Sequence, residues 1–206
     1  MADYSKHIWD YFLEKIGNKY GVAGLMGNLQ AESNLNPKNL QGTYESSLGF
    51  TDDTYTMAVD NRIYSKSQFI NDSAGYGLAQ WTYVTRKQGL YDMWQDGGYP
   101  SIGDINLACN YLWYELSNRY TGVLYTLQHA TSIRQASDAV LHDFESPADQ
   151  SESVEVYRAN LGNQWYSKYY NSSVVPTPGG SGGSGYKKSK PLSLLLMFQA
   201  TRRKVK

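Results

Sequence analysis

A stripe of apolar residues that ends in a glutamate, within residues 22–37, constrains this chain more than any other feature. The stripe is made of side chains spaced by three or four residues: Val22, Leu25, Met26 and Leu29. This spacing predicts a helix with one buried face, and Glu32 continues that face. Pro37 predicts that the helix ends nearby, because proline lacks the amide donor and restricts the residue before it. The sequence therefore predicts a carboxyl group in the last turn of a buried helix.

The predicted position of Glu32 favours its protonated form. Unpaired carbonyls at the end of a helix disfavour a negative charge, and partial burial acts in the same direction. We therefore expect a raised pKa for Glu32, which is what a general acid working near neutral pH requires. A glutamate at a fraying helix end can also simply face solvent, so the interpretation depends on the motifs that follow.

Helical periodicity recurs along most of the chain. It predicts further helices from Ser5 to Gly17, from Thr51 to Val59, from Thr82 to Gly97, from about 104 to 117, around 123–127, from 132 to 147 and from about 151 to 165. Residues 38–50 and 60–71 are predicted to be loops, and residues 78–81 a short extended piece. Strand signals are few. We therefore expect a mainly α fold with few or no strands.

Two glycines, Gly24 and Gly27, lie inside the predicted Glu32 helix. Glycine lowers helix propensity, so its presence there indicates that another element or a ligand approaches the backbone closely.

The charge of the chain divides at residue 179. All 19 acidic residues lie before it, with 12 of the 19 basic residues, which gives 12 − 19 = −7. The other seven basic residues give +7 and follow it: Lys187, Lys188, Lys190, Arg202, Arg203, Lys204 and Lys206. We therefore interpret the acidic body and the basic tail as separate parts.

Composition also predicts the domain organisation. Residues 171–185 are rich in proline, glycine and serine and predict a flexible linker. Residues 186–206 place basic residues on both sides of an apolar run at 192–198, a pattern that suits contact with an anionic membrane or lipopolysaccharide. The prediction is a domain at 1–170, a linker at 171–185 and a basic-apolar tail at 186–206.

Several kinds of site are not expected. The single cysteine, Cys109, allows no disulfide framework or cysteine metal site, and we expect it in the core. The histidines His7, His129 and His142 show no ligand spacing, so neither a metal nor a cofactor is predicted. The first residues lack the pattern of a signal peptide, and no apolar stretch approaches the roughly 18 residues of a membrane span. We expect a protein made in soluble form, with any export by another route.

Four motifs follow one another in the body. They are Glu-Ser-Asn-Leu-Asn-Pro at 32–37, Gly-Tyr-Gly-Leu-Ala-Gln-Trp at 75–81, Asn-Tyr-Leu at 110–112 and Phe-Glu-Ser-Pro at 144–147. This order resembles the lysozyme superfamily, which includes goose-type lysozymes and lytic transglycosylases, and most closely the phage tail lysozyme group. The resemblance extends over residues 8 to about 170. It implies a lysozyme-like helical domain with a substrate groove.

The resemblance implies a muramidase that cleaves the β-1,4 bond between N-acetylmuramic acid and N-acetylglucosamine in bacterial peptidoglycan. It makes Glu32 the catalytic acid, and such a protein acts on the cell wall whether it is released by a phage, carried on a virion or added externally. Residues that would line the glycan groove are Ser33, Tyr76, Gln80 and Trp81. Glu145 is expected either to contact substrate or to form a structural ion pair. The partner is the glycan strand, and no nucleic acid is predicted.

The sequence leaves open which residue, if any, is the second catalytic carboxylate. An inverting hydrolase needs a base to activate water, whereas a transglycosylase needs only the acid and a hydroxyl of the sugar. Asp72 is the first choice for the base because it precedes the 75–81 motif, although it is equally consistent with a simple turn residue. Asp52, Asp53 and Glu45 are alternatives. Two other functions remain possible from the sequence: a glycan-binding module without activity, and a passive carrier for a membrane-active tail.

Overall fold

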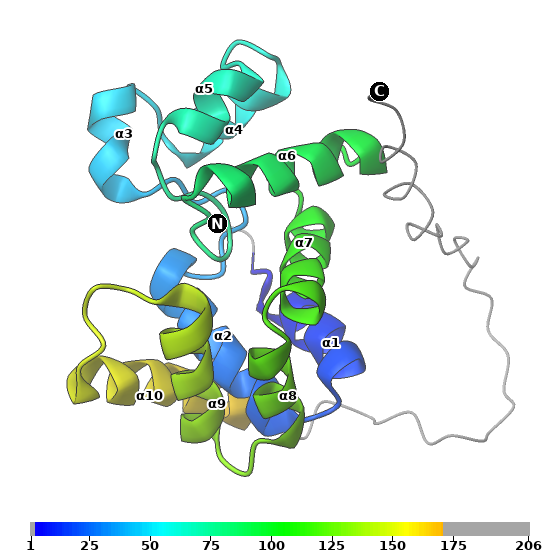
Figure 1. Ribbon diagram of the computed structural model, residues 1–206, viewed down its shortest axis with the longest axis vertical. Helices are drawn as coiled ribbons and strands as arrows, with labels where there is room; N and C mark the ends of the chain where they lie inside the picture. The colour runs from blue at the N-terminus through cyan, green and yellow to red at the C-terminus, as the bar shows by residue number, and fades with distance from the viewer. Residues whose placement is uncertain (1–2, 171–206) are drawn as a thin grey trace, which may run out of the picture. The chain divides into compact units, whose positions relative to one another are not determined.

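The computed structural model describes residues 3–170, which fold mainly into helices (Figure 1). The elements are α1 (Ser5–Ile16), α2 (Lys19–Ser33), α3 (Gly42–Leu48), α4 (Asp52–Asp60), α5 (Lys66–Asn71), α6 (Val84–Gly97), α7 (Ile105–Asn118), α8 (Thr121–His129), α9 (Ile133–Val140), the short π-helix η1 (Leu141–Glu145) and α10 (Glu152–Tyr169). Within residues 3–170 there is no strand, and β pairing is limited to isolated bridges from Tyr76 to Leu40 and Trp81. The expectation of a mainly α fold is confirmed. The predicted linker and tail lie outside the described residues.

Helix α2, which carries Glu32, is the centre of the larger group of helices. It packs against α1, α8, α9 and α10. Residues 21–29 are all buried, so the prediction of a single buried face was wrong for this part of the helix. The apolar stripe was predicted correctly, but neighbouring helices also cover the other sides, which carry glycine, alanine and one asparagine, Asn28.

The glycines of α2 allow this close packing. A Cβ atom at Gly24 would lie 2.6 Å from the Cβ of Ala136 on α9, and one at Gly27 would lie 2.3 Å from the backbone oxygen of Arg158 on α10. A Cβ atom at Gly21 would lie 2.0 Å from the backbone oxygen of Leu127 on α8. The close approach to the backbone of α2 that the glycines predict is therefore made by neighbouring helices. It brings α10 against the turn of α2 that precedes Glu32.

Two of the predicted loops contain helices. Residues 38–50 include α3, and residues 60–71 include α5. The signal for α5 was present, because Ser65 and Gln68 form a reciprocal capping box at its start. Helix α3 buries no residue and has no apolar stripe, so periodicity could not reveal it.

The motif at 75–81 is a tight turn rather than an extended piece. Tyr76 and Trp81 exchange two backbone hydrogen bonds, of 3.2 and 2.9 Å, which close the chain on itself. The helix that the sequence predicts from Thr82 begins instead at Val84. Tyr83 occupies the N-cap position of α6, and the hydroxyl of Thr82 donates instead to the backbone oxygen of Gln80.

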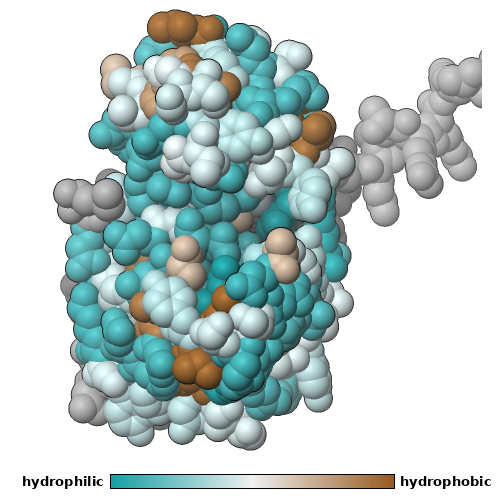
Figure 2. Space-filling view, turned by 90° about the vertical axis from the view of Figure 1, so that its left-hand side faces the viewer, coloured by the Kyte–Doolittle hydropathy of each residue, from teal (hydrophilic) through white to brown (hydrophobic). Residues whose placement is uncertain are grey.

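The helices form two groups. Figure 1 shows α3, α4 and α5 at one end and α1, α2, α8, α9 and α10 at the other, with α6 and α7 connecting them. Figure 2 shows that the surface is hollowed between an upper and a lower part, and that the hollow is mainly hydrophilic. The end of α2 lies at this boundary in Figure 1. None of the helices described is long and apolar enough to cross a membrane.

Candidate active site

Glu32 lies in the last turn of α2 and is paired with an arginine from α10. The Nη2 atom of Arg158 is 2.5 Å from Oε1 of Glu32, and the Glu32 side chain is 19% exposed. The helix ends directly afterwards because Asn34 adopts a left-handed conformation, with φ of 52°. The predicted position of Glu32 is therefore observed. The sequence argument did not foresee Arg158, whose guanidinium contacts the carboxyl group of Glu32.

A buried asparagine holds Arg158 in place. The Nη1 atom of Arg158 donates to Oδ1 of Asn28 at 3.1 Å, one turn before Glu32. The amide of Asn28 donates in turn to the backbone oxygen and the hydroxyl of Ser137 on α9, both at 3.1 Å. Side chains of α2, α9 and α10 thus form one network that fixes the guanidinium against Glu32.

Glu145 brings a second carboxyl group into the same electrostatic environment. It is the last residue of η1, and its Oε1 atom is buried with no hydrogen-bond partner among the described residues. Burial, followed by the negative charge of Glu32, raises the pKa of Glu145 well above its ordinary value, and Arg86 and Arg158 act in the opposite direction. Glu145 is therefore the carboxyl of this site that favours the neutral form.

A second arginine, Arg86 on α6, supports the Glu145 segment. The guanidinium carbon of Arg86 lies 4.6 Å from the centre of the Phe144 ring. Its Nε and Nη2 atoms donate to the two oxygens of Glu115 at 2.9 and 2.8 Å. The Nε1 atom of Trp81 donates to the same carboxylate at 2.8 Å. Glu115 is fully buried, so this cluster links the 75–81 motif to the Phe-Glu-Ser-Pro motif through α6 and α7.

Most residues predicted to line the groove are buried or hydrogen-bonded within the protein. The hydroxyl of Ser33 is buried and donates to the backbone oxygen of Leu78 at 2.8 Å, which ties the end of α2 to the 75–81 turn. Tyr76 and Trp81 are fully buried. Gln80 is partly exposed, and its amide donates to Oδ1 of Asn39 at 2.9 Å. These residues shape the loop beside Glu32, and direct contact with a glycan stays a prediction for each of them.

Asp72 is held in a buried ion pair. Its Oδ1 atom lies 2.5 Å from Nζ of Lys87, whose side chain is fully buried, and the Asp72 side chain is 3% exposed. The hydroxyl of Tyr55 donates to Oδ2, and the backbone amide of Ala74 donates to Oδ1 at 3.0 Å. Both oxygens are thus occupied by hydrogen bonds. The role of Asp72 as the base stays a prediction, whereas its contacts show a structural role.

The other predicted carboxylates have different surroundings. Asp52 accepts from the side chain of Asn36 and the backbone amide of Leu40, both at 2.7 Å, and so anchors the Glu-Ser motif to α4. Asp53 is largely exposed and pairs with Lys38 at 3.0 Å. Glu45 lies in α3. Of these three, Asp52 has the clearest structural role.

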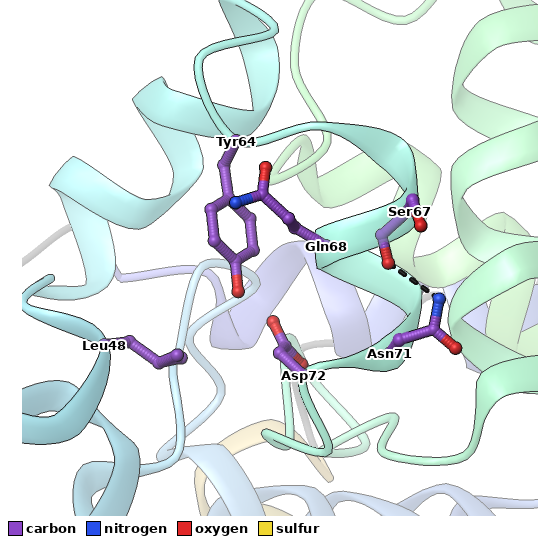
Figure 3. Close-up of a pocket in the computed structure, with 6 residues that line it drawn as sticks. All are labelled: Leu48, Tyr64, Ser67, Gln68, Asn71 and Asp72. Carbon is purple, nitrogen blue, oxygen red and sulfur yellow. Dashed lines mark hydrogen bonds between the residues drawn. The ribbon is translucent and has the colours of Figure 1, made fainter.

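A pocket of about 400 Å³ lies in the smaller group of helices (Figure 3). Its lining residues are Leu48, Tyr64, Ser67, Gln68, Asn71 and Asp72. This pocket is separate from the Glu32 site. Of the residues predicted for the active site, only Asp72 lines it. Among the residues described, no cluster of three or more histidine, cysteine or acidic side chains is arranged to bind a metal ion. Cys109 is buried, as expected, and burial raises the pKa of its thiol.

Two residues of the site were missed although the sequence held a signal for them. Glu115 lies three residues after Leu112, on the apolar face of α7, and the spacing argument used for Glu32 applies to it as well. Arg158 lies three residues before Leu161 on α10. Arg158 is buried, whereas its neighbour Tyr157 is 56% exposed.

This helical fold, with a carboxyl group at the end of a buried central helix, is that of a lysozyme-like helical domain. The profile of the phage tail lysozyme family matches residues 3–169, and the chain belongs to this family. The resemblance of the four motifs is thereby confirmed, and membership indicates a lysozyme-like function that acts on peptidoglycan. No curated protein matches the chain.

Proposed function

We propose that the protein is an N-acetylmuramidase that cleaves the β-1,4 bond between N-acetylmuramic acid and N-acetylglucosamine, with Glu32 as the general acid. The observation that carries this proposal is the position of Glu32. It is a partly exposed carboxyl in the last turn of the buried helix α2, where Arg158 pairs with it. Cleavage of a glycosidic bond requires such a group, because the leaving oxygen must receive a proton.

The neighbours of Glu32 suit this role. Arg158, held by Asn28, fixes the position of the carboxyl group, and Ser33 fixes the 75–81 turn against the same end of the helix. Positioning of this kind contributes to catalysis because the proton donor is already placed when the substrate binds.

A lytic transglycosylase is the second candidate, and the surroundings of Asp72 favour it. Both oxygens of Asp72 are bonded within the protein, and its side chain is almost completely buried. A base that activates water needs a free oxygen, whereas the transglycosylase route needs no second carboxylate. Mass spectrometry of the released muropeptides distinguishes the two reactions, since reducing ends indicate hydrolysis and anhydro ends indicate transglycosylation.

The substitution Glu32→Gln tests the proposed function. Glutamine has nearly the same shape and has no acidic proton to donate, so we expect lysis of purified cell walls to fall by at least about 10²-fold, the usual contribution of general acid catalysis. The matched control is Glu14→Gln, because the Glu14 side chain is 79% exposed and should leave the activity unchanged. If Glu32→Gln retains more than about a tenth of the activity, the acid is a different residue. A glycan-binding module would show no turnover in either form.

A further inference from the structure

Three amide side chains gather around Gly75, at the start of the 75–81 turn. They belong to Asn39, Gln41 and Gln80, and each of these residues is partly exposed. A Cβ atom at Gly75 would lie 2.8 Å from Oε1 of Gln80 and 3.3 Å from Oε1 of Gln41. The two glutamine side chains therefore meet over Gly75, and they can do so because this residue has no side chain of its own.

The surroundings of Gln80 fix which end of its amide is free. Its Nε2 atom donates to the backbone oxygen and to Oδ1 of Asn39, at 3.2 and 2.9 Å, and to the backbone oxygen of Gly77 at 3.2 Å. Only the nitrogen of the amide can donate to these three acceptors, so the network assigns its two ends. No described residue donates a hydrogen bond to Oε1 of Gln80. Gln80 therefore offers a ligand an acceptor and no free donor.

Gln41 is held in the opposite orientation. Its Oε1 atom accepts from the backbone amide of Gly75 at 3.0 Å, and its own backbone amide donates to the backbone oxygen of Gly75 at 2.8 Å. No described residue accepts a hydrogen bond from Nε2 of Gln41. A free donor on Gln41 thus lies close to the free acceptor on Gln80.

The backbone of Gln80 is strained. Its φ is 44°, in the left-handed region that residues other than glycine rarely adopt. Such conformations cluster at ligand clamps, where the surrounding structure holds them in place. The hydroxyl of Thr82 donates to the backbone oxygen of Gln80 at 2.8 Å. The hydroxyl of Ser33, one residue after Glu32, donates to the backbone oxygen of Leu78 at 2.8 Å, so the strained turn is tied to the helix of the proposed acid.

We propose that Gln41 and Gln80 bind an acetamido group of the glycan, and that Asn39 is a positioning residue that holds the Gln80 amide in the required orientation. This inference rests on the proposed function, whose substrate carries an acetamido group on both of its sugars. The N–H of that group donates to Oε1 of Gln80, and its carbonyl oxygen accepts from Nε2 of Gln41. A free amino group in the same place has no carbonyl, so it leaves Nε2 of Gln41 without a partner.

The binding of two tetrasaccharides tests the proposal. One is the β-1,4-linked tetramer of N-acetylglucosamine, and the other is the same chain after complete removal of its acetyl groups. We expect the protein to bind the acetylated tetramer at least about tenfold more tightly in calorimetry, because a site built to hydrogen-bond a substrate group rejects an analogue that lacks it. High salt screens the attraction between the basic deacetylated tetramer and the acidic body of the protein. Equal affinity for the two tetramers overturns the proposal.

Gln41→Glu removes the proposed donor and keeps the contact with Gly75. One carboxylate oxygen can still accept from the backbone amide of Gly75, whereas the other faces the acetyl carbonyl and cannot donate to it. We expect the affinity for the acetylated tetramer to fall at least about fivefold, as for an acceptor left without a partner, and the preference for acetylation to disappear. The control is Gln164→Glu, which makes the same change at an exposed position of α10 and should leave both affinities unchanged. A preference that survives Gln41→Glu shows that Gln41 does not bind the acetyl group.

A pair of substitutions at Asn39 tests its positioning role. Asn39→Asp keeps an oxygen that accepts from Nε2 of Gln80, whereas Asn39→Leu has no acceptor in its side chain. We expect Asn39→Leu to reduce the preference for the acetylated tetramer by about twofold to tenfold, the usual range for one hydrogen bond, and Asn39→Asp to retain the preference. If Asn39→Leu binds both tetramers as the wild type does, the orientation of Gln80 does not depend on Asn39 and the positioning role is wrong.

These measurements need no turnover, so the two proposals can fail separately. A protein that prefers the acetylated tetramer but leaves purified walls intact would contradict the muramidase proposal and support acetamido recognition. A protein that lyses walls but binds both tetramers equally would support the proposed function and overturn acetamido recognition by Gln41 and Gln80.

Discussion

At the scale of single residues, Asp72 shows how a candidate for the chemistry can also be essential to the fold. Its carboxylate faces the fully buried ammonium group of Lys87 and accepts from Tyr55. Burial lowers the pKa of Lys87, and the charge of Asp72 acts against this shift. The ammonium group therefore depends on Asp72 to remain charged inside the protein.

Asp72→Asn removes this charge and should destabilise the fold. Breaking one side of a buried ion pair typically costs about 3–5 kcal/mol because the other charge is left uncompensated. We expect a loss of this size in the free energy of unfolding, measured by chemical denaturation. The control is Asp92→Asn at the half-exposed Lys66–Asp92 pair, where the change should be at most about 1 kcal/mol. Wild-type stability combined with lost turnover in Asp72→Asn would instead place Asp72 in the chemistry.

At the scale of secondary-structure elements, the site depends on the distance between α2 and α10. Gly27 lets the backbone of α10 lie against α2 at Arg158. The same contact sets the guanidinium beside Glu32 and Asn28. The packing of these two helices and the geometry of the acid are therefore coupled.

Gly27→Ala should disturb both the fold and the site. The new methyl group would lie 2.3 Å from the backbone oxygen of Arg158 and 2.7 Å from the amide nitrogen of Gly162, neither of which can rotate away. We expect a destabilisation of at least about 1–3 kcal/mol, as is usual for overpacked interiors, and reduced wall lysis because Arg158 is displaced. Thermal unfolding and a turbidity assay measure the two effects.

The matched control for this substitution is Gly122→Ala. Gly122 lies in α8, and a Cβ atom there would meet nothing within 4 Å. The alanine should be neutral or stabilise the protein by up to about 1 kcal/mol through its higher helix propensity. If Gly27→Ala is as stable as Gly122→Ala, then α10 can move without cost and the close contact does not hold the site.

At the scale of the whole molecule, the separation of charge along the chain suggests a division of tasks. Residues before 179 carry a net charge of −7 and those after it +7. We propose that the basic-apolar tail, residues 186–206, aids contact with an anionic membrane or with lipopolysaccharide. Each basic residue near an anionic membrane contributes about 1 kcal/mol, and this attraction is screened by salt.

Deletion of residues 179–206 should reduce lysis of intact cells and hardly change lysis of purified walls that lack anionic polymers. The difference on intact cells should shrink as the ionic strength rises to about 0.15 M, where the Debye length is about 8 Å. Turbidity assays on both substrates at several salt concentrations measure it. Equal lysis of intact cells by the full and shortened chains at low salt would show that the tail contributes nothing.

The sequence by itself determined the features that depend on neighbours along the chain. The stripe through Leu25 and Leu29 placed α2 and put Glu32 in its last turn, and Thr51 marked the start of α4 correctly. The order of the motifs identified the family. Helical periodicity, capping and motif order are local properties, so they can be read without knowing what packs against them.

Only the tertiary structure decided what surrounds Glu32. Arg158 reaches it from a segment more than a hundred residues later in the chain. Ser33, Tyr76 and Trp81 are buried, although they belong to motifs expected to line the groove. Side-chain exposure and ion pairing depend on which helices close over a segment, and the glycines of α2 set how closely they do so. The sequence could therefore locate the proposed acid, whereas the charge that faces it follows from the packing of α2 against α10.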